Sequence, residues 1–183
     1  NDHFIIGANG SALSIDGGGT ANEEINTLTG RDGINTWSIT NNSNSLAVSD
    51  NLLTPYVTTF TGINKLVGGS DVDTFNINAA FNGSIDGGAG NDHFIIGADG
   101  SALSIDGGEG KDTLTGSDND STWLISGINN SLGEKDNETA LYVNEFTGIE
   151  KLVGGSANDN FIFSSTGITP WVVDGGLGIN NID

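Results

Sequence analysis

The chain of 183 residues contains no cysteine, which excludes a disulfide framework and any thiolate metal site. Only two residues are proline and only five are Lys or Arg. No apolar run approaches the length that spans a membrane, and no secretory signal peptide is recognisable. No stretch keeps the apolar spacing of an amphipathic helix long enough to predict one. We therefore expect neither membrane insertion nor substantial helix.

Negative charge dominates the composition, with 24 acidic residues and a formal net charge of −19. Such a chain repels nucleic acid and anionic membranes, so neither is expected as a partner. Many of the acidic residues stand at fixed places in turns, which favours cation binding; a role in solubility or a salty habitat is the alternative. Together with the lack of cysteine, this composition fits a protein exported by a bacterium.

Glycine is abundant, at 29 residues, and the apolar residues are mostly Ile, Leu, Val and Phe in short runs between Gly, Asn and Asp clusters. This composition is typical of many short strands joined by tight turns. The sequence therefore predicts an all-β fold.

The chain is an internal duplication. Residues 1–18 return at 91–108 with one change, Asn9 to Asp99, at an offset of 91 − 1 = 90 residues. Residues 60–70 return at 146–156 at an offset of 146 − 60 = 86, also with one change, because the first copy carries four extra residues near 20–25. Self-similarity at a fixed period indicates a stacked repeat architecture.

We divide the chain into unit 1 (residues 1–90) and unit 2 (residues 91–183), in one continuous stack. Because the first residue already lies inside a repeat, we expect the sequence to be a piece of a longer repeat protein. The neighbouring repeats of the same chain would then be its first partners.

A shorter period lies inside each unit. Gly-Gly pairs begin at positions 17, 68, 87, 107, 154 and 175, so several are separated by about twenty residues. One such turn per coil predicts a parallel β-solenoid, a β-helix or β-roll, with coils of about 20 residues. Within a coil we expect Phe94 and Ile96, then Leu103 and Ile105, to face inward. The longer segments 22–60 and 112–146 are expected to leave the stack as irregular excursions.

Two of the Gly-Gly turns carry a motif. Residues 87–95 (GGAGNDHFI) and 107–115 (GGEGKDTLT) fit the pattern G-G-x-G-x-D-x-U-x, where U is a large apolar residue. The pattern resembles the RTX nonapeptide of secreted bacterial proteins that fold on binding calcium. The resemblance implies that turn carbonyls and the Asp of one motif form half a calcium site, which a neighbouring turn completes.

The related turns 68–76 and 154–162 keep the Asp but lack the third Gly, and the turns 17–25 and 175–183 lack the Asp. RTX motifs also run in tandem, whereas this chain has one per coil, so the sequence predicts a few calcium sites and not a full ladder. A purely structural Gly-Asp turn is the alternative. The candidate metal-site residues are Asp73, Gly87, Gly88, Gly90, Asp92, Gly107, Gly108, Gly110, Asp112 and Asp159.

A second set of acids precedes the Gly-Gly pairs, at Asp16, Asp86, Asp106 and Asp174. These carboxylates either bind metal or cap their own turns through backbone amides. His3 and His93 occupy one repeated position, just before an inward Phe, and are expected to point outward without a role.

Trp37, Trp123 and Trp171 are expected to pack in the core, with a sugar-stacking platform as the alternative. The chain is not expected to be an enzyme. No nucleophile–base pair, P-loop or dinucleotide fingerprint is present. Near-identical repeats also argue against a single asymmetric active site, and five basic residues are too few to neutralise an acidic polysaccharide.

The recurring segments FTGIEKLVGGS and SIDGGAGND are similar to the long repeat regions of giant secreted bacterial surface proteins. That resemblance implies a structural stalk, adhesin or matrix role outside the cell, with rigidity set by calcium and an extracellular glycan or a cell surface as partner. The alternative function is a carbohydrate-binding surface. An ice-binding surface is disfavoured, because Thr-x-Thr pairs occur only singly.

Overall fold

The computed structural model describes residues 1–19, 24–42, 44–48, 55–127, 129–135, 137, 140–164 and 172–183. Its strands form two mixed sheets, and no helix occurs in these ranges. Most strand pairs are parallel. The predicted all-β class is therefore confirmed. Over the same ranges, no helical segment has the length and apolar character needed to cross a membrane.

Sheet A is the 11-stranded sheet. In spatial order it contains β1 (His3–Ile5), β3 (Thr27–Thr29), β7 (Lys65–Gly69), β9 (Ala80–Gly90), β11 (Ser101–Asp106), β16 (Leu141–Thr147), β15 (Asn130–Glu134), β14 (Ser121–Ile125), β18 (Asn160–Phe163) and β20 (Asn181–Ile182), with β12 (Glu109–Gly110) paired to β9.

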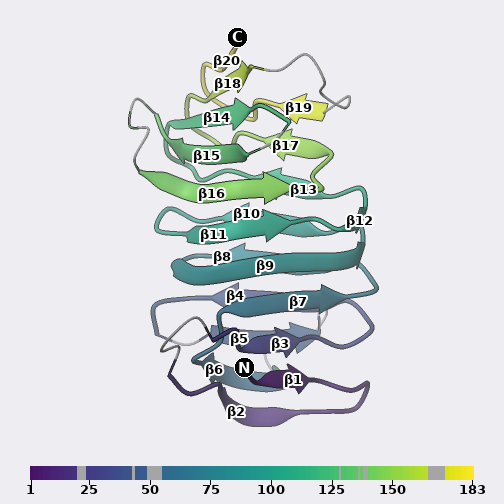
Figure 1. The fold of residues 1–183 in the computed structure, drawn as a ribbon. Coiled ribbons are helices and arrows are strands. Elements are labelled where there is room, and N and C mark those ends of the chain that lie inside the picture. The colour runs from purple at the N-terminus through teal and green to yellow at the C-terminus, as the bar shows by residue number, and fades with distance from the viewer. Residues whose placement is uncertain are drawn as a thin grey trace.

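Sheet B is the 9-stranded sheet. In spatial order it contains β19 (Val172–Asp174), β17 (Lys151–Val153), β13 (Thr113–Thr115), β10 (His93–Ile96), β8 (Thr74–Ile77), β4 (Asn35–Ile39), β5 (Asn44–Val48), β6 (Val57–Thr61) and β2 (Ala12–Asp16). Figure 1 shows the strands of both sheets stacked one above another, with the N-terminus towards the bottom and the C-terminus at the top.

The chain crosses from one sheet to the other after most strands. It enters β8 in sheet B, β9 in sheet A, β10 in sheet B and β11 in sheet A. Alternate strands along the chain therefore lie side by side, β8 beside β10 and β9 beside β11. Side chains of the same kind therefore stack. Phe94 lies beside Phe75 and Leu114, and the rings of Phe94 and Phe75 are 5.0 Å apart and nearly parallel. The buried core is a column of such contacts between the sheets.

The two longer segments do not leave the stack as the sequence predicted. Their described residues form antiparallel strands inside the sheets, β4–β5–β6 in sheet B and β14–β15–β16 in sheet A. Trp37 on β4 and Trp123 on β14 are 0% exposed, and each stacks on the Phe of the next parallel strand. Burial of these large rings holds both antiparallel segments in place.

Equivalent strands of the two units lie in opposite sheets. From β1 the chain visits sheets A, B, A, B, A, B and A before β10, the copy of β1, begins in sheet B. The antiparallel segment therefore adds two strands to sheet B in unit 1 and two to sheet A in unit 2. Each sheet therefore contains one of the two antiparallel segments.

One predicted core position is wrong. Leu103 is 51% exposed, and Ala102 is buried in its place beside Ile105. In β11 the buried Ala102 and Ile105 are separated by two residues, so the strict inward and outward alternation breaks at Leu103 and Ser104. The pairing with β9 shifts register at the same place, where Asn82 and Gly83 of β9 stand opposite Leu103 alone, which marks a β-bulge in β9.

Candidate functional site

The Gly-Gly turns of β7, β9 and β11 stack on one edge of the fold, where the chain crosses from sheet A to sheet B. Gly69 pairs with Gly88, and Gly90 pairs with Gly110 through the short strand β12. Gly88 and Gly108 have φ of +94° and +88°, a conformation that glycine adopts readily. A Cβ on either would also meet a backbone carbonyl of the turn stacked beside it. These glycines allow three turns to stack closely.

Three of the predicted carboxylates are linked by backbone hydrogen bonds along this edge. The N–H of Asp73 donates to Oδ1 of Asp92, and the N–H of Asp92 donates to Oδ1 of Asp112, both at 2.7 Å. The ladder ends in two other residues. Asn35 donates its N–H to Oδ1 of Asp73 at 2.7 Å, and Asp112 donates its N–H to Oε2 of Glu150 at 2.8 Å. We call Asp73, Asp92 and Asp112 the acidic ladder, with Asn35 and Glu150 as its ends.

Each carboxylate of the acidic ladder is 0% exposed, and its second oxygen, Oδ2, has no hydrogen-bond partner among the described residues. Burying a carboxylate without compensation is costly, so the neutral form is favoured. Burial raises the pKa of Asp73 to about 7 and that of Asp92 to about 6. It also raises the pKa of Asp112. Each Oδ2 therefore requires either a proton of its own or a cation beside it.

The second oxygens face backbone carbonyls. A Cβ placed on Gly68 would meet both Asp73 Oδ2 and the carbonyl oxygen of Gly87. A Cβ placed on Gly87 would meet Asp92 Oδ2 and lie 2.5 Å from the carbonyl oxygen of Gly107. Two oxygens thus point into one small space beside each glycine, and when the carboxyl is ionised both are acceptors without a proton.

At comparable positions elsewhere in the fold, an Asn side chain stands beside the glycine carbonyls and supplies the N–H donor that an ionised Asp lacks. Asn35 donates Nδ2 to the carbonyl oxygens of Gly33 and Gly68, at 2.7 and 3.3 Å. Asn26, which directly precedes β3 as Asp112 precedes β13, donates Nδ2 to the carbonyl oxygen of Gly17 at 2.9 Å. The Asn side chain therefore donates hydrogen bonds to glycine carbonyls. An ionised Asp side chain has no N–H to donate to such a carbonyl, and its Oδ2 is left without a partner among the described residues.

Asp159 lies on the opposite edge, where the chain crosses from sheet B to sheet A, and so is not brought to the acidic ladder. Its Oδ1 accepts a hydrogen bond from Ser121 Oγ, and its N–H donates to Asn180 Oδ1 at 2.9 Å. Its Oδ2 is buried and, within the described part of the chain, has no partner. Burial raises the pKa of Asp159 as well.

The acids that precede the Gly-Gly pairs behave differently. Asp16, Asp106 and Asp174 each accept the N–H of the residue two positions on, at 2.9, 3.2 and 3.1 Å. Asp86 forms an ion pair with Lys65, with 3.3 Å between Oδ2 and Nζ. Of the two interpretations open for this set, turn capping matches three members.

The sequence motif missed Asn26, Asn35 and Glu150, because none of them stands in a G-G-x-G-x-D segment. The alignment of the two units at an offset of 86 residues identifies two of them. It aligns Asn26 with Asp112 and Asn64 with Glu150, and all four residues directly precede a strand. A search for the residue before each strand would have found Asn26 and Glu150, whereas Asn35 is itself the first residue of β4.

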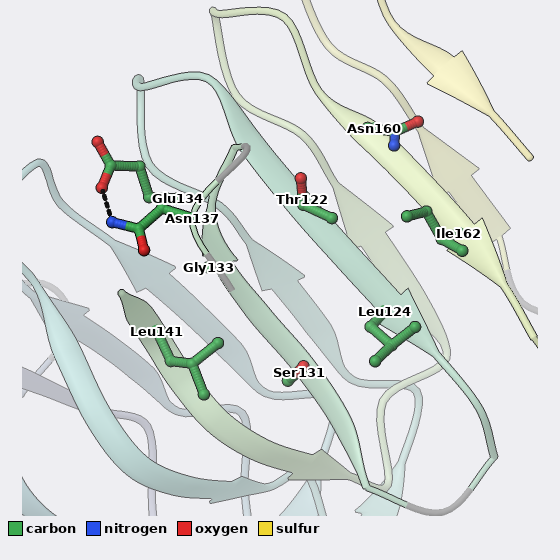
Figure 2. A pocket seen from close by; sticks show the side chains of 9 residues that line it. All are labelled: Thr122, Leu124, Ser131, Gly133, Glu134, Asn137, Leu141, Asn160 and Ile162. Atoms are coloured by element: carbon green, nitrogen blue, oxygen red, sulfur yellow. Dashed lines mark hydrogen bonds between the residues drawn. The ribbon is translucent and has the colours of Figure 1, made fainter. Parts of the chain in front are cut away.

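A separate hollow lies on sheet A over β14, β15 and β18 and has a volume of about 460 Å³ (Figure 2). Leu124 and Ile162 supply apolar lining, and Asn137 donates to Glu134 at 3.1 Å near β15. In unit 1 the position of Leu124 is held by Ser38. None of the predicted metal-site residues lines this hollow.

The tryptophans predicted as a possible sugar platform do not provide one at two of the three positions. Trp37 and Trp123 are fully buried and cannot stack on a ligand. Trp171 lies outside the described residues.

Among the described residues, no group of three or more His, Cys, Asp or Glu side chains is placed to hold a metal ion. A cation at the turns would therefore depend on backbone carbonyls for most of its ligands, as calcium readily does. Comparison of the chain with protein-family models, curated proteins and solved structures finds no match.

Proposed function

We propose that the chain is a calcium-stabilised structural segment of a large exported bacterial surface protein, a stalk, adhesin or matrix scaffold. The two sheets would be the walls of a β-solenoid. The chain crosses between the sheets after most strands, and most strand pairs are parallel. The chain would act by holding its shape and not by catalysis. The RTX-like motifs at 87–95 and 107–115 support this proposal.

One observation carries the calcium part of the proposal. Buried Asp oxygens stand beside glycine carbonyls in the acidic ladder, where Asn amides stand at comparable places elsewhere in the same fold. Calcium binds six to eight oxygens, including carboxylates and backbone carbonyls, so the donor set fits it. Asp73, Asp92, Asp112 and Asp159 would supply the charge, and glycine carbonyls such as those of residues 87 and 107 would supply neutral ligands.

The charge of the chain suggests how calcium would control folding. At −19 the chain repels itself, and burying several carboxylates adds to the cost. In the low calcium of a cytosol the acidic turns would stay open, and in millimolar calcium outside the cell they would close. Binding that favours the folded state stabilises it by RT ln(1 + [L]/Kd) for each site.

The experiment is far-ultraviolet circular dichroism and thermal unfolding of the chain, in millimolar calcium and in excess chelator. The proposal expects strand signal and a cooperative transition in calcium, with a large loss of one or both in chelator. Magnesium at the same concentration is the control, because it requires a stricter octahedral geometry. Identical spectra and melting temperatures in all three conditions would rule the proposal out.

A further inference from the structure

The end of the acidic ladder has a neutral twin in the same chain. In unit 2 the N–H of Asp112 donates to Glu150 Oε2 at 2.8 Å. In unit 1 the N–H of Asn26 donates to Asn64 Oδ1 at 2.7 Å. The four residues are equivalent in pairs at the offset of 86 residues, and the flanking glycines are kept in both units. The same hydrogen bond, from a backbone N–H to a side-chain oxygen, joins the two residues of each pair. The pair in unit 2 carries two formal negative charges, and the pair in unit 1 carries none.

The neutral twin is complete as it stands. Asn26 is 1% exposed and donates Nδ2 to the carbonyl oxygens of Gly17 and Gly62, at 2.9 and 3.0 Å. Every polar atom of the Asn26 side chain is therefore used, because its Oδ1 also accepts the N–H of Asp2 at 2.9 Å. No ion is needed to hold this pair of turns together.

The acidic twin is not complete. Asp112 is 0% exposed, and its Oδ2 has no hydrogen-bond partner in the part of the chain that the structure describes. A Cβ added at Gly107 would lie 2.7 Å from this oxygen and would meet the carbonyl oxygen of Gly148. Gly148 is the equivalent of Gly62, so the carbonyl that receives an amide proton in unit 1 faces a carboxylate in unit 2.

Glu150 makes this place different from its neutral twin. It brings a second carboxylate to the frame, and after burial and a hydrogen bond from Asp92 its charge is the next influence on Asp112, where it raises the pKa. Asp73 and Asp92 likewise face one carboxylate at the next position of the ladder, but both acids of those pairs lie in Gly-Gly turns. The turn 147–150 lacks a Gly-Gly pair, so no motif marks it.

We infer that Asp112 and Glu150 form a divalent-cation site of their own, between the turn 107–112 and the turn 147–150, with the Gly148 carbonyl as a neutral ligand. The inference rests on the proposed function and names one of its sites. Two carboxylates in place of two amides favour a hard divalent cation, because affinity follows the charge of the ligands. The equivalent place in unit 1 lacks this charge and has no such site.

The test exchanges the twins in the full chain and measures calcium binding by isothermal titration calorimetry. Asp112→Asn with Glu150→Asn installs the residues of unit 1 and should remove one ion from the stoichiometry. Asn26→Asp with Asn64→Glu installs the residues of unit 2 and should add one ion. Circular dichroism in calcium checks that each variant is folded, and the neutral exchange should fold because unit 1 already uses that arrangement.

The outcomes separate the two proposals. If the wild-type chain binds calcium and the neutral exchange retains every ion at unchanged affinity, the site at Asp112 and Glu150 is refuted while the proposed function stands. If the wild-type chain binds no calcium, the proposed function fails and the site fails with it. Loss of one ion in the neutral exchange and gain of one ion in the acidic exchange supports the site.

Discussion

The backbone N–H of Asp92 lies 2.7 Å from Oδ1 of Asp112, and this bond orients the Asp112 side chain so that its other oxygen is buried beside a glycine carbonyl. The same relation joins Asp73 to Asp92. The ladder thus uses one oxygen of each carboxylate for structure and leaves the other without a donor in the described residues. Stability of the fold should depend on whatever neutralises that second oxygen.

Asp92→Asn should make the fold less dependent on calcium. The amide keeps the Oδ1 acceptor and adds an N–H donor towards the Gly107 carbonyl, as Asn26 does towards Gly17. An unsatisfied buried acceptor costs about 1–3 kcal/mol, so the variant should melt roughly 3–8 °C above the wild type in chelator. The gain from adding calcium should shrink in the variant.

Asp106→Asn is the matched control for that measurement, because Asp106 is exposed and only caps its own turn through Gly108 N–H. It should leave the melting temperature in chelator within about 1–2 °C of the wild type, since surface changes alter stability little. A rise in Asp106→Asn as large as in Asp92→Asn would show that loss of net charge, and not the ladder, is responsible.

The pH dependence of stability in chelator should be unusual for an acidic chain. Burial raises the pKa of Asp73 from 3.8 to about 7, so between these values the folded chain holds a proton that the unfolded chain has released. Stability from this group is complete below pH 4 and is lost as pH rises towards 7. Denaturant unfolding at intervals of pH should show this decline, and saturating calcium should reduce it.

Asp73→Asn tests the assignment, because an amide does not titrate. The decline between pH 4 and 7 should become shallower in the variant, while the contributions of the other buried acids remain. An unchanged slope would mean that Asp73 is not protonated in the folded chain.

Gly87→Ala should disrupt the acidic turns. An added Cβ would meet Asp92 Oδ2 and the Gly107 carbonyl oxygen, in a stack of backbone that has no room to move apart. We expect a loss of roughly 1–3 kcal/mol of stability in calcium and weaker calcium binding, by analogy with overpacked cores. Gly7→Ala is the control, since no described atom lies within 4 Å of the added carbon. Equal effects in the two variants would contradict the close stacking of the turns.

Trp123→Ala should unfold much of unit 2. The ring is fully buried, stacks on Phe161 at 5.4 Å and meets Phe146 edge-on. Truncating a buried Trp costs about 3–5 kcal/mol. Leu124→Ser changes the adjacent exposed residue to the one that unit 1 carries and should cost little. Urea unfolding of both variants makes the comparison, and a small loss for Trp123→Ala would refute the core role of the ring.

Much of this arrangement was readable in the sequence, because glycine turns repeat at the period of the stack. The composition predicted all-β structure, the duplication and the Gly-Gly spacing predicted a stack, and the motif turns singled out Asp73, Asp92 and Asp112 as candidate metal-site residues. The Asn and Glu members were not predicted, because ladder positions are set by which turns stack, across separations such as 38 residues between Asp112 and Glu150. A motif read along the chain does not contain that information.

The antiparallel segments and the bulge were missed for a related reason. The segments that contain Trp37 and Leu46 were expected to be irregular excursions, because apolar alternation gives neither the direction nor the partner of a strand. Their pairing across β4 and β5 depends on the connection between them. Leu103 was misplaced because strict alternation was assumed, whereas two residues separate the buried Ala102 from the buried Ile105 in β11.

The most direct test of the central claim is the amount of calcium bound per chain at equilibrium, measured by dialysis against millimolar calcium and elemental analysis. The wild-type chain is compared with a variant in which Asp73, Asp92, Asp112 and Asp159 are all Asn. We predict bound calcium in a small whole-number ratio to the wild-type chain, and a folded variant that retains almost none. A wild-type chain without calcium, or a variant that retains the wild-type amount, would contradict the account.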